Sequence, residues 1–285
     1  MPRFQEALEI EPTSDAAYLG LANAYEKMSR FEDAEKTCLQ AIGLRPNYWA
    51  GYNWLGAFYI GRERHAEAEK QFAQVVALSP VNARGYNNLG AALYFQGKVK
   101  EAIAAYEKSL AIRPNASALS NLGTLYFFEE GDYARAAKTF EQAVQMGPDD
   151  YRLWGNLGDA RKWSGDPEGM RTAYQKALAL AEAARQLDPR NAQVLADLAA
   201  YHASLGDTAR AGPLMQRALK AAPKNASVLF QAAVLNELYL KQRDEALRLL
   251  ERALREGAPR KEIERSPGLA ELRADPRYRK LLPLK

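Results

Sequence analysis

Seven prolines divide most of this chain into segments of nearly constant length. Five of the six intervals are 34 residues and the remaining one is 41. The prolines are Pro12, Pro46, Pro80, Pro114, Pro148, Pro189 and Pro223. Proline has no backbone N–H and ends a helix, so it separates helices at the same phase of every segment. A period of this length predicts an array of repeated supersecondary units.

Other positions keep the same phase. A leucine followed by glycine or alanine recurs in the first half of the segments, and alanines beside a bulky residue recur in the second half, as in Leu89-Gly90, Ala102 and Tyr106. Spacings of three and four place such residues on one helical face, and the small residue lets two helices approach closely. Each segment therefore predicts two helices joined by a turn. Asparagines that follow the prolines are expected to cap the next helix: Asn47, Asn82, Asn115, Asn191 and Asn225.

This pattern resembles that of the tetratricopeptide repeat family. The second full segment shows it as Tyr52, Leu55-Gly56, Tyr59, Ala68, Phe72, Val75 and Pro80. The resemblance covers residues 3–258 and implies an all-α fold, a right-handed α-solenoid of tandem helix–turn–helix units with a concave groove. We expect a half repeat at 3–14, repeats that start near residues 15, 49, 83, 116, 151, 192 and 226, and capping helices at 259–285.

Three departures from the pattern carry expectations of their own. The half repeat lacks its first helix, which favours either a fragment of a longer protein or pairing of this edge with another copy. The fourth repeat loses one residue before Leu122 and gains one near Gly131, which shifts its turn. The fifth repeat gains seven residues within 171–187. These give either a longer helix or a helix end that touches a partner.

The end of the chain carries a second resemblance. Residues 267–278 read Pro-Gly-Leu-Ala-Glu-Leu-Arg-Ala-Asp-Pro-Arg-Tyr. This is similar to the C-terminal end of bacterial signalling proteins in which tetratricopeptide repeats follow a serine/threonine kinase, nucleotide cyclase or transcription-regulator domain. The resemblance implies that the chain is the regulatory or substrate-recruiting arm of such an enzyme. The chain itself has no kinase or cyclase motif.

Composition and motifs favour a cytoplasmic protein without catalytic residues. Apolar residues make up 47% of the chain, no apolar run approaches the ~18 residues that a membrane span needs, and the N-terminus does not read as a signal peptide. The net charge of +4 is too small to predict nucleic-acid binding. The chain has one cysteine, Cys38, and two histidines, His65 and His202, too few to predict a metal site. We expect Cys38 and His202 to be buried core residues and His65 to be a solvated turn residue. We expect no cofactor.

The residue before the Leu-Gly pair lies on the stripe that lines the family's groove. It is Asn88, Asn121 and Asn156 in three successive repeats, with Trp54 in the repeat before them and Asp197 in the repeat after them. Each amide offers a donor and an acceptor, so the three predict a ladder that holds the backbone of an extended peptide. The alternative is that asparagine is merely the family's common choice at this position.

Aromatic residues form a second candidate surface. Phe95, Phe128 and Trp163 each lie six residues after the leucine of the pair. They predict an apolar strip near the open end of the groove, or packing against the turn to the second helix. Arg84 and Arg152 would add positive charge suited to an acidic peptide.

These residues together predict a non-enzymatic scaffold that binds an extended peptide or partner helix in its groove. Its partners would be proteins or peptides, with no nucleic acid and no membrane. Two alternatives remain: the arm of a larger bacterial signalling enzyme, and a self-assembly module that pairs through the open N-terminal edge.

Overall fold

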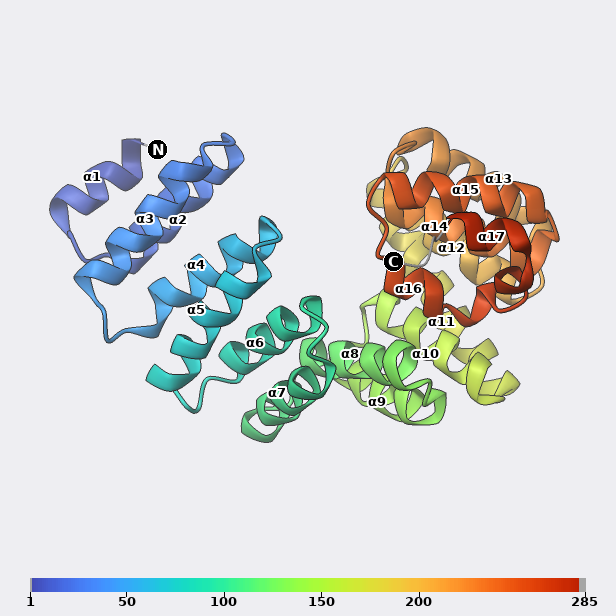
Figure 1. Ribbon diagram of the computed structural model, residues 1–285, viewed down its shortest axis with the longest axis horizontal. Coiled ribbons are helices and arrows are strands. Elements are labelled where there is room, and N and C mark those ends of the chain that lie inside the picture. Colours follow the sequence, from blue (N-terminus) through green and yellow to red (C-terminus); the bar gives the residue numbers. More distant parts are fainter. Residues whose placement is uncertain (1, 282–285) are drawn as a thin grey trace. The chain divides into compact units, whose positions relative to one another are not determined.

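A computed structural model describes residues 2–281, and every regular element among them is a helix. The helices form two compact units, which divide between residues 122 and 123. In both units, consecutive helices pack as pairs joined by short turns, the arrangement of an α-solenoid (Figure 1). The last four residues of the expected capping region, 282–285, lie outside the described residues.

The first unit holds one single helix, three helix pairs and the beginning of a fourth pair. Its helices are α1 (Pro2–Ile10), α2 (Asp15–Lys27), α3 (Phe31–Leu44), α4 (Trp49–Gly61), α5 (His65–Leu78), α6 (Ala83–Phe95), α7 (Val99–Ile112) and the start of α8 (Ala116–Leu125). The pairs are α2 with α3, α4 with α5 and α6 with α7. No residue of α1 is fully buried, and Ile10 on it is 86% exposed.

The second unit completes the array and continues past it. It contains the end of α8, the π-helical turn η1 (Tyr126–Glu130), α9 (Tyr133–Met146), α10 (Tyr151–Ser164), α11 (Pro167–Leu187), α12 (Ala192–Ser204), α13 (Thr208–Ala221), α14 (Ala226–Leu235), the π-helical turn η2 (Asn236–Leu240) and α15 (Arg243–Arg255). The C-terminal segment follows with α16 (Arg260–Arg265), the 3-10 turns η3 (Pro267–Leu269) and η4 (Leu272–Ala274), and α17 (Pro276–Leu281).

The departures from the repeat pattern have clear structural forms. The seven added residues of the fifth repeat lengthen one helix, since α11 has 21 residues where α9 and α13 have 14. The extra residue near Gly131 is taken up by η1, because a π-helical turn holds one residue more than an α-turn. The turn η2 occupies the corresponding place in the last repeat.

The glycine of the Leu-Gly pair lies directly beneath the bulky residue of the second helix. A Cβ atom added at Gly90 would come within 2.7 Å of the Tyr106 ring, and one at Gly158 within 2.7 Å of the Tyr174 ring. Tyr106 and Tyr174 are almost fully buried. The small residue therefore sets how closely the two helices of a pair pack.

Four of the five expected asparagine caps are present. The side chains of Asn82, Asn115, Asn191 and Asn225 each accept a hydrogen bond from the backbone N–H three residues later, at 2.8–3.2 Å. The expectation for Asn47 is wrong, because α4 begins one residue further on and its N-cap is Tyr48, which makes no side-chain cap bond.

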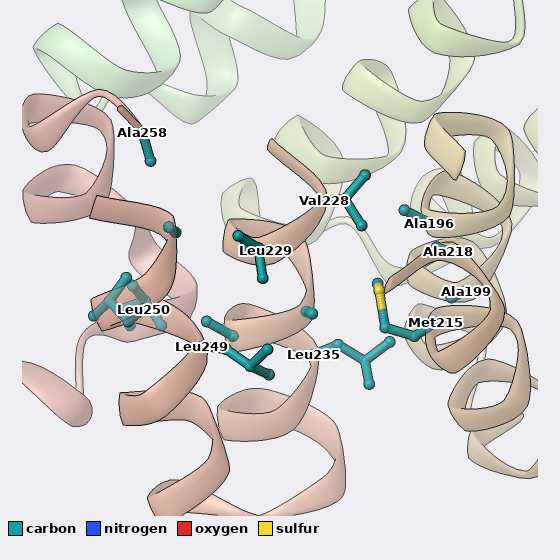
Figure 2. Packing of buried hydrophobic residues seen from close by; sticks show 14 of the residues in the cluster. Ala196, Ala199, Met215, Ala218, Val228, Leu229, Leu235, Leu249, Leu250 and Ala258 are labelled. Atoms are coloured by element: carbon teal, nitrogen blue, oxygen red, sulfur yellow. The ribbon is translucent and has the colours of Figure 1, made fainter. Parts of the chain in front are cut away.

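The C-terminal segment shares the core of the last two helix pairs. Side chains of α14 lie between those of α12 and α13 on one side and those of α15 on the other (Figure 2). Four residues of the C-terminal segment belong to the same buried cluster: Ile263, Leu269, Leu272 and Tyr278. The segment is thus an integral part of the second unit.

Cys38 lies in the core of the first unit and is 2% exposed. Burial raises the pKa of its thiol to about 12, and the carboxylates of Glu26 and Glu35 act in the same direction. Because only the thiolate attacks disulfide reagents, we expect labelling at pH 8 to be roughly 1000-fold slower in the native protein than in denaturant. Absorbance during reaction with a disulfide reagent checks this, and fast native labelling would contradict the burial.

The two histidines differ in their surroundings. His202 is buried, as expected, with its Nδ1 3.5 Å from the Asp207 carboxylate. The expectation that His65 is a solvated turn residue is wrong. His65 is the first residue of α5, and its ring stacks on Phe95 with 4.7 Å between centroids. Its Nδ1 is buried and has no hydrogen-bond partner within residues 2–281.

Candidate functional site

We call the first helix of each pair an inner helix. The inner helices of neighbouring pairs touch one another, as α2 does α4, α4 does α6, and α12 does α14. The residues expected to bind a peptide lie on the inner helices or directly after them. Each unit therefore carries its own share of these residues.

The asparagines of the first unit are linked to the preceding repeat. Asn88 Nδ2 donates to Asn53 Oδ1 at 2.9 Å, and Asn121 Nδ2 donates to Asn87 Oδ1 at 3.2 Å. Each bond uses one of the two N–H groups of its donor amide. The amides thus connect successive inner helices, a role beyond the predicted one, and their contact with a peptide stays a prediction.

The equivalent positions of the second unit have different surroundings. Asn156 is half-buried and lines a small cavity with Phe128 and Asp159. Asp197 is 7% exposed and accepts hydrogen bonds from Gln193 and Gln231, both at 2.8 Å, and from the Tyr151 hydroxyl at 3.2 Å. Loss of hydration raises the pKa of the Asp197 carboxyl, and these hydrogen bonds offset part of that rise.

Two of the three predicted aromatic residues meet in one larger cavity of the second unit. This cavity has a volume of about 290 Å³ and is lined by residues of η1, α10, α12, α14, η2 and the C-terminal segment. Phe128 and Trp163 line it, together with Phe230 and Tyr239. Phe127 also lines it and packs edge-on against Phe128, with 4.8 Å between their ring centroids. Such a volume lies at the lower end of the range for small-ligand sites.

The C-terminal segment forms one wall of this cavity. Glu262, Ser266, Pro267 and Gly268 line it. Arg265 forms an ion pair with Glu129 of η1, whose side chain is only 5% exposed. A Cβ atom at Gly268 would lie 2.9 Å from the Val234 side chain, so the backbone of the segment packs closely on α14.

Three charged side chains border the cavity. Lys162 Nζ donates to the Tyr239 hydroxyl at 2.5 Å and lies 5.1 Å from the centroid of the Trp163 ring. Burial lowers the pKa of Lys162, and the nearby Asp159 opposes this. Although water reaches Asp159, the surrounding protein raises the pKa of its carboxyl, which accepts a 2.6 Å hydrogen bond from Tyr174. Burial alone raises the pKa of Glu262.

The remaining predicted residues do not join this cavity. Phe95 belongs to the first unit, where it is 55% exposed and stacked on His65. Arg84 is exposed on α6. Arg152 is exposed on α10, with its guanidinium carbon 5.2 Å from the centroid of the Tyr151 ring and its charge close to Asp197. A joint role of the two arginines toward an acidic peptide stays a prediction.

Family models for the tetratricopeptide repeat match residues 1–55, 50–115, 82–148 and 172–226. Together these ranges cover most of the sequence. The chain belongs to the tetratricopeptide repeat family. Members of this family act as scaffolds for protein interaction, so the repeats indicate protein partners.

Solved structures support the repeat fold at low sequence identity. The APC/C hetero-tetramer Cut9-Hcn1 matches with a TM-score of 0.65 and 18% identity, over 92% of this chain and 50% of that chain. A tetratricopeptide repeat protein from Parabacteroides merdae matches with a TM-score of 0.62 and 16% identity, over 88% and 96%. Pseudomonas aeruginosa pilF matches with a TM-score of 0.58 and 19% identity, over 76% and 96%. None of the curated proteins matches the sequence.

Two kinds of feature are missing from the described repeats. Residues 2–281 contain no group of three or more His, Cys, Asp or Glu side chains that could hold a metal ion. None of the helices within the same range has the length and apolar character needed to cross a bilayer.

Sequence reasoning missed half of the cavity. Phe230, Tyr239 and Glu262 lie in the degenerate last repeat and in the C-terminal segment, where no Leu-Gly pair marks the phase. The repeat spacing marks neither aromatic residue, because Phe230 lies elsewhere on the last inner helix and the residue of η2 that corresponds to Phe128 of η1 is Leu238, one before Tyr239. Lys162 and Asp159, which flank the predicted Trp163 on α10, were also missed.

Proposed function

We propose that this protein is a non-enzymatic scaffold that binds an extended peptide or a partner helix along its inner helices. The observation that carries the proposal is the concentration of aromatic side chains beside the inner helices: Phe95 in the first unit, Phe128 and Trp163 in the second. Burying one such side chain is worth about 1.5–3 kcal/mol, more than one net hydrogen bond from an amide. Asn88, Asn121 and Asn156 supply polar contacts to the peptide backbone, and Arg84 and Arg152 supply positive charge.

The test compares three forms of the full chain in affinity capture from the native lysate. Alanine at Phe95, Phe128 and Trp163 is expected to remove the captured proteins, with at least a tenfold loss for a purified partner. The matched control places alanine at three exposed lysines of second helices, Lys108, Lys138 and Lys176, and is expected to capture the wild-type set. Circular dichroism checks that all forms keep their helicity. Equal capture by the aromatic and wild-type forms would contradict the proposal.

Self-association is a second candidate, and α1 favours it. Phe4 lies against Gly20 of α2, but Ile10 and the rest of α1 leave an apolar face uncovered. Pairing with another copy would bury this face. A sedimentation mass that rises with concentration, and that Ile10→Glu returns to the monomer value, would favour this role; a constant monomer mass would oppose it.

The proposed setting is the cytoplasm of a bacterium, in which the repeats recruit substrates for a larger signalling enzyme such as a kinase or cyclase. This setting rests on the resemblance of residues 267–278 to the C-terminal ends of such proteins. The upstream reading frame tests it, since a frame without a catalytic domain would oppose the recruiting role.

A further inference from the structure

The cavity of the second unit differs from an open groove because the C-terminal segment closes one of its sides. The wall is the C-terminal segment, anchored by the Arg265–Glu129 ion pair and by two leucines, Leu269 and Leu272, that are fully buried in the core. A wall held by core residues does not move aside without loss of packing. The part of a ligand that enters this cavity is therefore a compact group, such as a single side chain of a longer peptide.

The walls of the cavity carry aromatic rings from four different elements. Phe128 comes from η1, Trp163 from α10, Phe230 from α14 and Tyr239 from η2. Aromatic rings attract cations through the negative charge on their faces, most strongly when water is partly excluded. Lys162 already shows this preference within the protein, since its ammonium lies over the Trp163 and Tyr239 rings.

Two of the three charged side chains at the cavity already have interaction partners. Lys162 is bonded to the Tyr239 hydroxyl and attracted by Asp159, and Asp159 is bonded to Tyr174. Glu262 has neither a hydrogen bond nor an ion pair among the residues that the structure describes, although it is half-buried at the edge of the aromatic walls. Two carboxylates against one ammonium leave the cavity with an excess negative charge on Glu262.

A larger hollow of about 840 Å³ lacks this combination. It lies between α13, η2 and α15, carries no aromatic side chain among its lining residues, and has two of its arginines already paired, Arg243 with Glu237 and Arg248 with Glu245. The smaller cavity places the carboxylate of Glu262 beside an aromatic surface, and this combination favours a cationic ligand.

We propose that the cavity formed by Phe128, Trp163, Phe230 and Glu262 binds an organic cation with an apolar stem, such as the guanidinium of an arginine side chain. Glu262 pairs with the cation, and the rings cover its stem and faces. A planar guanidinium suits such a site because it can bond a carboxylate with two N–H groups while stacking on a ring. This inference goes beyond the proposed scaffold role, because it holds whether the cation is free or carried by a partner protein.

Calorimetric titration of the full chain with N-acetyl-arginine methylamide tests the proposal. We expect a dissociation constant on the order of 1 mM for this single side chain. N-acetyl-citrulline methylamide has nearly the same shape without the charge, and we expect it to bind at least tenfold more weakly. Benzyltrimethylammonium, a cation that donates no hydrogen bond, forms the third arm. Its binding would show that charge and aromatic faces suffice, and its failure beside arginine binding would assign the affinity to the guanidinium hydrogen bonds.

Two variants, for which we expect opposite changes in arginine affinity, test whether the charges of the cavity determine binding. Glu262→Gln is expected to weaken arginine binding about tenfold and leave citrulline unchanged. Lys162→Met removes the competing ammonium and is expected to strengthen arginine binding several-fold. The matched control is Glu264→Gln, an exposed position two residues further along α16. It should change the affinity for neither arginine nor citrulline.

Three results would overturn the cation site: equal binding of arginine and citrulline, no effect of Glu262→Gln in a folded protein, or weaker arginine binding in Lys162→Met, which would mean that the ammonium supports binding and does not compete with the cation. The outcome is separable from that of the scaffold role. Probe binding without protein capture leaves the cation site standing alone, and capture without probe binding leaves the scaffold alone.

Discussion

Alanine at both Leu269 and Leu272 is expected to destabilise the C-terminal end of the second unit severely. Both side chains are fully buried in the cluster that contains Leu229 and Leu250. Removing a buried leucine side chain costs about 2–5 kcal/mol at each site, against a total stability of roughly 5–15 kcal/mol for a typical domain. We expect urea unfolding, followed by circular dichroism, to begin at much lower urea, with α14 and α15 losing amide protection first.

Glu271 provides the control for this change because it lies between the two leucines in the same segment. Its side chain is 81% exposed and 3.8 Å from Arg243 at its nearest approach. Glu271→Ala should shift stability by no more than about 0.5 kcal/mol. If the double leucine variant were as stable as this control, the segment would not belong to the core, and the fixed wall of the cavity would lose its support.

The array of helices was predictable because its determinants are local and repeated. A proline that ends each unit and a small residue beneath a bulky one, such as Gly90 beneath Tyr106, recur at the same phase. Each repeat therefore specifies its own helix pair and packs mainly on its neighbours. The inner helices begin at Asp15, Trp49, Ala83, Ala116, Tyr151, Ala192 and Ala226.

The cavity could not be predicted in the same way. The C-terminal segment that closes one side of it lies outside the repeats. The position of this segment depends on contacts between distant parts of the chain, such as Arg265 with Glu129. Charge pairs of this kind leave no periodic trace in a sequence. Phe128 and Trp163 were found because they share a phase, whereas Glu262 has no repeat position at all.

The asparagine ladder shows which contacts a repeat pattern describes and which it does not. The positions of Asn88 and Asn121 follow from the repeat, but their pairing with Asn53 and Asn87 depends on how neighbouring inner helices are offset. A one-repeat pattern describes contacts within a helix pair better than contacts between pairs. The signal for this pairing was nevertheless present, because Asn53 and Asn87 both precede the ladder position by one residue.

Asp197 occupies the ladder position in the sixth repeat, and its replacement by leucine is expected to cost roughly 2–4 kcal/mol in the free energy of unfolding. Leucine has the same branched skeleton with larger methyl groups in place of the oxygens, and it cannot accept hydrogen bonds. The Tyr151 hydroxyl and the amides of Gln193 and Gln231 would then lose the acceptor that they share. Urea unfolding at pH 7 measures this loss.

Asp197→Asn is the matched variant, because it keeps an acceptor oxygen and gives this position the residue type found at Asn88, Asn121 and Asn156. The folded-state pKa of Asp197 is raised by burial, so its proton is bound more tightly in the folded than in the unfolded protein. The contribution of this group to stability is therefore fully present below its unfolded pKa of ~4 and is lost as the pH rises through the raised folded value. Asparagine, which does not ionise, avoids that loss.

We therefore expect Asp197→Asn to be at least as stable as the wild type at pH 7, with an advantage that shrinks as the pH falls toward ~4. An advantage that instead grows with acidity would mean that hydrogen bonds from Gln193, Gln231 and Tyr151 outweigh the loss of hydration. In that case the carboxylate stabilises the junction of α10, α12 and α14 as an anion. The pH dependence of one substitution thus separates a tolerated buried charge from a stabilising one on the inner helices.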